Sequence, residues 1–515
     1  MRARALAVLG TGSDVGKSVI TAGLCRLFLR AGRRVAPFKA QNMSNNSFVT
    51  PDGKELGRAQ ALQAEACGLE PDADMNPILL KPESDRTTQI VVQGAVWGKA
   101  DAAAYFQGQH DLIERVRESY DRLASRYDMI VIEGAGSAAE VNLRDRDLAN
   151  WSMVEWADAQ VVLVADIDRG GVFAQILGTL DLLHPSERAR VAGIIVNKFR
   201  GDRSLFEDGV AFLEQRSGLP VLGVVPMLRN LILDQEDSLD ITRFRSSVFE
   251  PDRVNIAVVL LPRMSNFTDF DQLAGEPDVV LRYAARPTDL DGADVVMLPG
   301  SKNTIGDLRA LRESGMAEAI CAGHRRGCEV VGICGGYQML GREIGDPEGI
   351  ESGGEMMGLG LLDCMTTIQS RKITEQIHGY WLHGDTDVPP SINGYAIHMG
   401  QTDRGREVPC FRIWSARTGP EAGVASLDGA VSQDGRTWGS YIHGLFDQPG
   451  FRRRWLNRIR LRKSLTPLDI SVSNQVAAQK CEELDRWADH LHAHLTLAPF
   501  LRSEGEPFKP SADIA

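Results

Sequence analysis

The sequence predicts an α/β protein of two domains, each built on a parallel β-sheet with helical crossovers. Three observations support this prediction. The 515 residues exceed what one hydrophobic core normally organises, since single cores stop growing near about 250–300 residues. Short apolar runs alternate with amphipathic stretches in both halves of the chain. A polar, acidic stretch separates the halves, so we expect domains over 1–235 and 253–497, a linker over 236–252 and a tail over 498–515.

The first domain contains six short runs rich in β-branched residues, which predict the strands of one parallel sheet. In chain order they are Ala5–Leu9, Val35–Phe38, Met129–Ile132, Val161–Ala165, Ala192–Val196 and Val221–Val225.

A glycine-rich loop, GTGSDVGKS, follows the first predicted strand and precedes a helix-like run. We expect its backbone N–H groups, around Gly12 and Gly16, to face phosphate oxygens. Lys17 adds a positive charge, and Ser18 offers a hydroxyl to Mg²⁺. The strict pattern requires glycine where this chain has Thr11, so the loop is a variant form. A tight turn with a surface lysine is the alternative, and the strand-loop-helix context favours the phosphate site.

Two later strand ends carry polar residues that fit a nucleotide site. Glu133, in MIVIEGAG, is the expected carboxylate for Mg²⁺, which keeps several waters and uses few protein ligands. Asn197 and Lys198, in IIVNKFRGD, are placed to contact the nucleotide, since an amide can bind a base edge.

The second domain begins with an apolar run at Val254, and further strands are predicted at Val295–Pro299, Glu329–Ile333 and Trp438–His443. Cys334 lies in VVGICGGYQ, where a predicted strand runs into a small-residue turn and a predicted helix. This pattern predicts a nucleophile elbow, because small neighbours allow the strained turn that presents a thiol beside backbone N–H donors. The other seven cysteines are interpreted as small buried hydrophobic residues.

A thiolate needs an imidazole to move protons to and from a leaving amine. His443, in WGSYIHGLF, ends a predicted strand and is our first candidate, and His398, in GYAIHMG, is the second. The loop LPGSKNT could supply an oxyanion donor through the backbone that follows Gly300.

Composition excludes several other classes of protein. The charges of 57 Lys and Arg against 69 Asp and Glu give a net charge of −12, and no basic patch is evident, so neither nucleic acid nor an anionic membrane is an expected partner. The eight cysteines form no Cys-x-x-Cys pair, which fits a reducing cytoplasm. No stretch reaches the roughly 18 apolar residues of a membrane span. The sequence does not specify an oligomeric state.

Taken together, these motifs resemble the cobyric acid synthases, the glutamine-dependent amidotransferases of cobalamin biosynthesis. The first half resembles a dethiobiotin-synthetase-like ATP-binding domain in GTGSDVGKS, PFKAQNMSNNS, MNPILLKP, EGAGSAAEVNL and NKFRGD. The second half resembles a class I glutamine amidotransferase domain, which is flavodoxin-like, in LPGSKNT, GICGGYQ and YIHGLF.

The resemblance implies that Cys334 and His443 hydrolyse glutamine through a thioester, in an oxyanion and glutamine pocket that includes Gly300, Gly335 and Gln338. It also implies that ATP, with Mg²⁺, phosphorylates a carboxylate of a corrinoid polycarboxylate, and that ammonia displaces the phosphate. Repetition at four propionates, b, d, e and g, of adenosylcobyrinic acid a,c-diamide would give adenosylcobyric acid.

Two positions depart from the pattern of related enzymes. Triad glutaminases carry a glutamate two residues after the catalytic histidine, where this chain has Leu445, so another group must orient His443. The family segment GYEIH is GYAIH here, with Ala396 in place of glutamate.

Substrate contacts are expected from polar residues of the first domain: Lys39, Asn42, Asn45, Asn46, Lys81 and Asp147. The local field should become positive at Lys17, Lys39, Lys81, Arg144 and Arg146, because both proposed substrates are anionic. Three alternatives remain open: amidation of the a and c acetates by a cobyrinic acid a,c-diamide synthase, amidation of another polycarboxylate, or a partitioning-type ATPase fused to a degenerate glutaminase.

Overall fold

The computed structural model describes residues 3–84, 87–101, 105, 109–228, 231, 233, 247–383, 389–419, 425–470, 476–497 and 500. Residues 236–246 of the predicted linker lie outside these ranges, as does the predicted tail apart from Phe500. No helix in the described part of the chain is long and apolar enough to cross a membrane.

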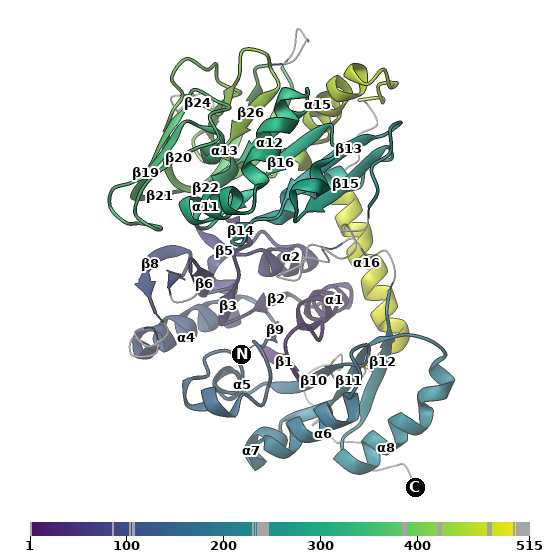
Figure 1. The fold of residues 1–515 in the computed structure, drawn as a ribbon. Coiled ribbons are helices and arrows are strands. Elements are labelled where there is room, and N and C mark those ends of the chain that lie inside the picture. The colour runs from purple at the N-terminus through teal and green to yellow at the C-terminus, as the bar shows by residue number, and fades with distance from the viewer. Residues whose placement is uncertain are drawn as a thin grey trace.

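The first domain is organised by a sheet of six parallel strands (Figure 1). All six predicted runs are strands of this sheet. Their order across it is β12 (Val221–Pro226), β11 (Val191–Phe199), β10 (Gln160–Asp166), β1 (Arg4–Gly10), β9 (Met129–Glu133) and β2 (Val35–Phe38). Because β1 is central and parallel to its neighbours, the loop after β1 lies at the same edge as Glu133 and Asp166, which end β9 and β10.

Helices cover both faces of this sheet. Alternate residues of β1 point to opposite faces, so each face presents apolar side chains that helices must cover. Leu6 and Val8 belong to one core, and Ala7 and Leu9 to the other. The Leu6 face is covered by α1 (Lys17–Arg30), α2 (Arg58–Ala66) and α16 (Val476–His494). The Ala7 face is covered by α4 (Gln109–Arg126), α5 (Trp151–Ala157), α6 (Val172–Leu182) and α8 (Glu207–Ser217), with the short α7 (Pro185–Arg188) following α6.

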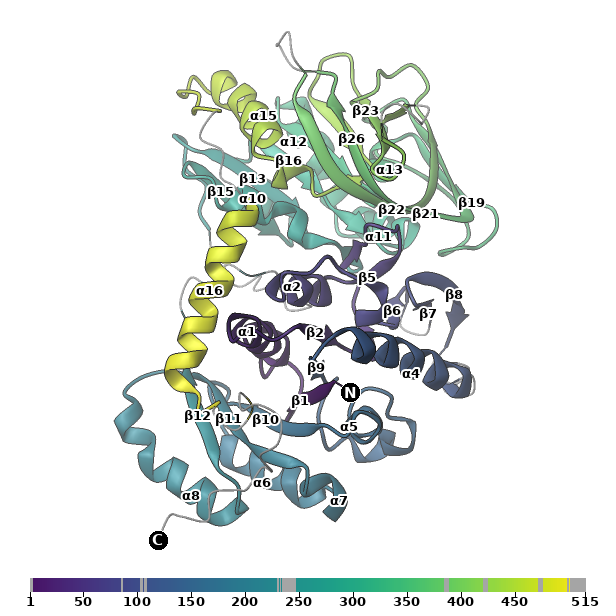
Figure 2. The ribbon, with the colours of Figure 1, turned by 180° about the vertical axis from the view of Figure 1, so that it is seen from behind.

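The position of α16 corrects the predicted domain boundary. We assigned residues up to 497 to the second domain, but α16 returns to the first domain and packs along α1 (Figure 2). A Cβ on Gly23 of α1 would lie 2.3 Å from Cδ1 of Leu491, so the two helices are in close contact. Buried apolar side chains on α16 drive this return, since they need an apolar face to cover.

A smaller β-layer of the first domain lies between the two large sheets (Figure 1). Its four strands are ordered β3 (Gln41–Met43), β6 (Ile78–Pro82), β7 (Thr88–Val92) and β8 (Ala95–Ala100). The short strands β4 (Ser47–Val49) and β5 (Glu55–Gly57) pair beside it. This layer was not predicted, because its strands are short and carry polar residues.

The second domain contains another six-stranded sheet, with the order β15 (Val279–Ala284), β13 (Val254–Val259), β16 (Val295–Leu298), β18 (Glu329–Ile333), β26 (Thr437–Ser440) and β25 (Ala430–Val431). All neighbours are parallel except β25 and β26. Its helices are α10 (Asp271–Ala274), α11 (Thr304–Glu313), α12 (Met316–Arg325), α13 (Gly335–Leu340) and α15 (Pro449–Arg462). The α/β prediction is therefore confirmed for both domains.

A second, mainly antiparallel sheet completes this domain. Its path is β20 (Gly354–Met357), β19 (Glu343–Asp346), β21 (Met365–Trp381), β22 (Ser391–Asp403) and β27 (Ile442–His443). Beside this path, β23 (Phe411–Ser415) pairs with β21, and β24 (Ser426–Asp428) pairs with β23. The two-residue strands β14 (Met264–Ser265) and β17 (Gly300–Ser301) pair separately. Since β27 ends at His443 and β18 ends just before Cys334, the two sheets deliver both candidate catalytic residues to one region.

Candidate active site

Cys334 lies on a sharp turn between β18 and α13. Its φ of 52° and ψ of −109° are a conformation that L-residues rarely adopt. The following residues must be glycine, because a Cβ on Gly336 would lie 2.0 Å from the carbonyl oxygen of Leu298. The strained turn and its small neighbours have the geometry expected of a nucleophile elbow.

His443 reaches the same site from β27 and is held by a buried carboxylate. Its Nδ1 lies 2.7 Å from Oδ2 of Asp269, and the N–H of Gly444 donates to Oδ1 of Asp269 at 2.9 Å. Asp269 lies on the short 3₁₀ helix η4 (Phe267–Phe270) and is only 3% exposed. Burial lowers the pKa of His443, but the charge and hydrogen bond of Asp269, together with Cys334, raise it to about 10.

Asp269 is a candidate functional residue that the sequence analysis missed. It supplies the orienting carboxylate that Leu445 cannot provide, and it precedes His443 by 174 positions. No local motif marks it, because its role depends on a contact that only the folded chain creates.

His398 has a different environment from His443. Its Nδ1–H donates to the carbonyl oxygen of Gly400 at 2.8 Å, and its ring stacks on Tyr441 with 3.8 Å between ring centroids. Burial lowers its pKa to about 4, so it is neutral near pH 7. The carboxylate partner therefore distinguishes His443 as the candidate base.

The residues predicted for the oxyanion and glutamine pocket lie beside Cys334. A Cβ on Gly335 would lie 2.8 Å from the nitrogen of Ser301, which follows Gly300 in β17, so the two backbone segments are in contact. Gln338, on α13, accepts a hydrogen bond from Thr304 Oγ1 at 2.9 Å and donates to the Tyr441 hydroxyl at 3.2 Å.

A pocket of about 50 Å³ joins these groups at the boundary between the domains. Cys334, Gln338 and His443 line it from the second domain, and Lys81 lines it from β6 of the first domain. This placement corrects our prediction for Lys81, which we expected in the substrate cleft of the first domain. Its Nζ instead lies 2.6 Å from Oε1 of the buried Glu55.

The phosphate loop has the predicted arrangement between β1 and α1. Gly16 has a φ of 99°, and a Cβ there would lie 2.3 Å from Nδ2 of Asn197, so only glycine fits. The Nζ of Lys17 donates to the carbonyl oxygens of Gly12 at 2.8 Å and Gly136 at 2.9 Å, which holds the ammonium group over the loop.

Glu133 is the centre of a buried polar cluster next to this loop. Its Oε1 accepts from Ser18 Oγ at 2.7 Å and from Lys39 Nζ at 2.9 Å, and its Oε2 accepts from Gln63. A hydroxyl and a carboxylate in contact are the oxygen donors that Mg²⁺ takes beside a phosphate, so the residues fit that ion. Among the described residues, no group of three or more His, Cys, Asp or Glu could hold a metal by itself. A site at Ser18 and Glu133 would therefore rely on phosphate and water for its other ligands.

Asn197 and Lys198 lie at the end of β11, and their side chains contact the phosphate loop. Asn197 Nδ2 donates to the carbonyl oxygen of Val15 at 2.9 Å, and Lys198 Nζ donates to Oδ2 of Asp166 at 2.9 Å. Lys198 Nζ also donates to the carbonyl oxygen of Asp14, so both side chains hold the backbone of the phosphate loop. Asp166, which ends β10, was not predicted as part of this cluster.

A larger pocket of about 380 Å³ opens beside the phosphate loop. It includes Gly136, Arg144, Arg146 and Asp147, together with apolar residues of β6 and β7. Asp147 is the predicted substrate residue that lines this pocket, where its carboxylate also accepts from the N–H of Trp151 at 2.6 Å.

The other predicted substrate residues do not line the large pocket. Lys39 binds Glu133, as described above, and Asn42 donates to Gln60 at 3.0 Å inside the domain. Asn45 donates to the carbonyl oxygen of Pro82 at 3.4 Å, and Asn46 accepts from the N–H of Phe267 in the second domain at 3.3 Å. The asparagine-rich segment therefore belongs to the layer between the domains.

Comparison with protein families agrees with this division into two sites. Residues 6–239 match the CobQ/CobB/MinD/ParA nucleotide binding domain, and residues 255–451 match the CobB/CobQ-like glutamine amidotransferase domain. Over 512 residues the chain is 49% identical to a cobyric acid synthase of Syntrophobacter fumaroxidans, covering 98% of this chain and 99% of the relative. The chain belongs to the cobyric acid synthase family.

A second cobyric acid synthase, from Citrobacter koseri, is 49% identical over 502 residues, covering 96% of this chain and 97% of the relative. Among solved structures, PurLQS from Thermotoga maritima matches 46% of this chain and 99% of that chain, with 17% identity and a TM-score of 0.30. The two family matches and the full-length relatives identify this cobyric acid synthase family member as a glutamine amidotransferase with a nucleotide-binding domain in the same chain.

Proposed function

We propose that the chain amidates the four propionate carboxylates, b, d, e and g, of adenosylcobyrinic acid a,c-diamide to give adenosylcobyric acid. Glutamine supplies the nitrogen, and ATP activates each carboxylate. One observation carries the proposal: two pockets lie on opposite faces of the strand pair β6 and β7. Leu80 lines the pocket beside the phosphate loop, and its neighbour Lys81 lines the pocket that contains Cys334.

In the smaller pocket, the Cys334 thiolate attacks the amide carbon of glutamine. The imidazolium of His443 gives its proton to the leaving nitrogen, which departs as ammonia and leaves a thioester. His443 then takes a proton from water, which hydrolyses the thioester to glutamate. The N–H groups of Gly335 and Ser301 are the candidate donors to the oxyanion of both tetrahedral intermediates.

In the larger pocket, a substrate carboxylate attacks the terminal phosphorus of ATP to give an acyl phosphate and ADP. Ammonia then attacks the acyl carbon, and phosphate leaves with the formation of the amide. Lys17 is placed to balance phosphate charge, and Ser18 and Glu133 would hold Mg²⁺. When bound, Mg²⁺ would neutralise charge on the phosphate oxygens.

The lining of the larger pocket suits a large, partly apolar substrate. Leu80, Ile90 and Trp151 offer apolar surface, and Arg144 and Arg146 offer guanidinium groups that suit carboxylates. The carboxylates of Asp101, Glu140 and Asp147 also line the pocket and can accept from amide groups.

The proposal is tested by replacing the nucleophile and changing the nitrogen donor. We expect Cys334→Ala to abolish amidation with glutamine but to retain ATP-dependent amidation with ammonium salts, as followed by mass spectrometry of the corrinoid product. Cys410→Ala is a matched control, because Cys410 is also buried in the second domain but does not line the pocket.

Continued use of glutamine by Cys334→Ala would contradict the assignment of the nucleophile. A product amidated only at the a and c acetates would identify a cobyrinic acid a,c-diamide synthase. ATP hydrolysis with no amide on any corrinoid acid would favour another polycarboxylate substrate or a non-amidating ATPase.

A further inference from the structure

The hairpin of β6 and β7 is a wall between the two pockets, and its two faces belong to different sites. Leu80 and Ile90 form a cross-strand pair and line the large pocket. The next pair, Lys81 and Gln89, faces the second domain, where Gln89 accepts from Lys372 at 3.2 Å. This alternation follows from the two-residue period of a strand.

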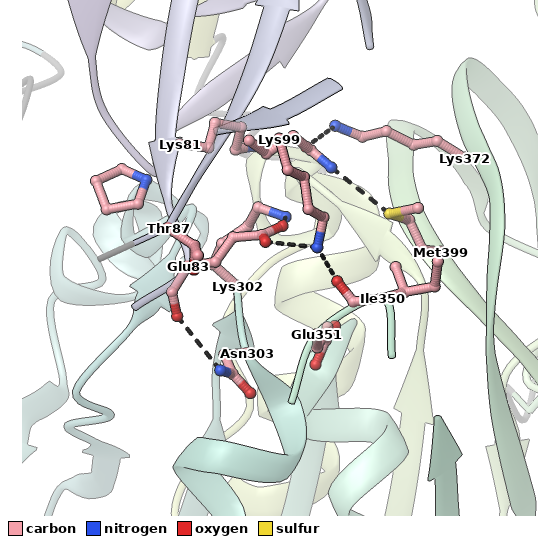
Figure 3. Close-up of polar contacts among 12 residues, drawn as sticks. Lys81, Glu83, Thr87, Lys99, Lys302, Asn303, Ile350, Glu351, Lys372 and Met399 are labelled. Atoms are coloured by element: carbon pink, nitrogen blue, oxygen red, sulfur yellow. Dashed lines mark hydrogen bonds and ion pairs between the residues drawn. The ribbon is translucent and has the colours of Figure 1, made fainter. Parts of the chain in front are cut away.

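Glu83, immediately after β6, makes further contacts between this hairpin and the second domain (Figure 3). Its carboxylate lies between two ammonium groups: Oε1 is 2.7 Å from Lys302 Nζ, and Oε2 is 2.5 Å from Lys99 Nζ. Its carbonyl oxygen accepts from Asn303 Nδ2 at 3.3 Å. Glu83 is only 3% exposed, so these charges interact in a largely desolvated place.

Glu83 contacts Lys302 and Asn303 of the second domain. These two residues come immediately after Ser301, the candidate oxyanion donor. Asn303 also caps α11, since its Oδ1 accepts from the N–H of Gly306 at 2.9 Å. The next residue, Thr304, donates to Gln338 inside the small pocket. The segment 301–304, which we call the oxyanion loop, is held within the second domain by α11, by pairing with β14, and by Glu351, whose Oε2 accepts from the N–H of Thr304 at 2.6 Å. From the first domain it is held by Glu83.

The position of this loop matters for the rate of glutamine hydrolysis. An oxyanion donor acts only when it lies about 2.7–3.1 Å from the developing charge, so a small displacement weakens it. Removing the charge of Glu83 would take away the carboxylate that Lys302 contacts at 2.7 Å, and the largely buried ammonium group would draw the loop towards a position that solvates it better.

We propose that Glu83 is a positioning residue for glutamine hydrolysis, by which the hairpin of the nucleotide-binding domain holds the oxyanion loop of the glutaminase domain. The proposal rests on the proposed function of the small pocket as the glutamine site. Glutamine hydrolysis would then depend on correct docking of the β6–β7 hairpin, which also lines the large pocket.

The chain offers a matched control in Glu55. This buried carboxylate also lies between one lysine of each domain, with Lys81 at 2.6 Å and Lys372 at 2.5 Å. Both lysines line the small pocket, but neither belongs to the oxyanion loop. Glu83→Gln and Glu55→Gln therefore remove equivalent charges from the same interface, but only the first touches the loop.

The experiment compares Glu83→Gln, Glu83→Asp and Glu55→Gln in the full-length chain, with steady-state kinetics for glutamine and for ammonium. For Glu83→Gln we expect kcat with glutamine to fall by about tenfold, less than the 10²–10³ for complete loss of an oxyanion donor. We expect KM for glutamine to change by less than kcat and amidation with ammonium to persist. Glu83→Asp should recover part of kcat. Glu55→Gln alters lysines that line the pocket but not the loop, so we expect it to change KM for glutamine more than kcat.

Three results would overturn the proposal: an equal loss of kcat in Glu83→Gln and Glu55→Gln, a parallel loss of amidation with ammonium, or an unchanged kcat. If Glu83→Gln fails to fold, Lys302→Met removes the same ion pair from the other side and must show the same loss of kcat. If the wild-type chain hydrolyses glutamine but amidates no corrinoid acid, the proposed function is refuted. The proposal for Glu83 is still tested in that case, because its readout is the rate of glutamine hydrolysis.

Discussion

Asp269 determines which proton the His443 imidazole can move. Because its carboxylate accepts from Nδ1, it leaves Nε2 available to the thiol side of the site. Asp269→Asn would present an amide N–H to the same nitrogen and favour the opposite tautomer. We therefore expect kcat with glutamine to fall by about a hundredfold or more, measured as glutamate release. Amidation with ammonium should continue.

Asp271→Asn is the control for this substitution. Asp271 lies two residues further along, on α10, and the change of charge is identical. An equal loss of glutaminase rate in both variants would show that η4 and α10 respond to charge in general, and that Asp269 has no specific role in orienting His443.

The ion pair between His443 and Asp269 makes the stability of the folded chain depend on pH. The pKa of His443 is raised from the ordinary 6.5 to about 10 in the folded chain, so the folded state binds the proton more tightly than the unfolded state. The stabilisation is fully present below about pH 6.5 and is lost progressively as the pH rises towards about 10. The difference in unfolding free energy between wild type and Asp269→Asn, measured in denaturant at several pH values, should therefore shrink over this range. A constant difference would contradict it.

Single residues were predictable where a local pattern constrains the backbone. The small residues around Cys334 and the strand end at His443 gave both catalytic candidates from the sequence. Asp269 and Glu83 were not found, because each acts through a contact between segments that are remote in the chain. Lys81 was misplaced for a related reason: the sequence identified a strand, but not which face of it met which domain.

At the scale of elements, the first sheet and its phosphate loop were predicted because their signals are local and redundant. The departure at Thr11 is also understandable, since among the described loop residues the positive φ values fall at Asp14 and Gly16 and not at positions 11–13. The small layer of β3, β6, β7 and β8 was missed. Its strands have three to six residues, and polar residues such as Lys81 and Gln89 occupy buried positions that hydrophobic patterning does not reveal.

At the scale of the whole molecule, the net charge of −12 is reversed locally between the domains. The contact region shown in Figure 3 includes Lys81, Lys99, Lys302 and Lys372, which face only Glu55 and Glu83 in the ion pairs described above. Burial lowers the pKa of Lys372 to about 8, although Glu55 opposes this, so the lysine still carries its charge near pH 7. Lys81, Lys302 and Lys372 line the small pocket together with Glu351, whose pKa burial raises to about 7. The lysines there are placed to attract the carboxylates of glutamine and glutamate.

The return of α16 makes the first domain discontinuous in sequence, so its stability depends on residues that follow the whole second domain. Leu491 is fully buried between α16 and α1, and we expect Leu491→Ala to lower the free energy of unfolding by about 2–5 kcal/mol, as loss of a core leucine does. Nucleotide binding should weaken with it, because α1 begins at Lys17. Denaturant unfolding and nucleotide titration would measure both effects, with the exposed His492→Ala as the control. Unchanged stability in Leu491→Ala would mean that the first sheet and its helices fold without α16, and that the domain boundary at residue 253 is a true division of the chain.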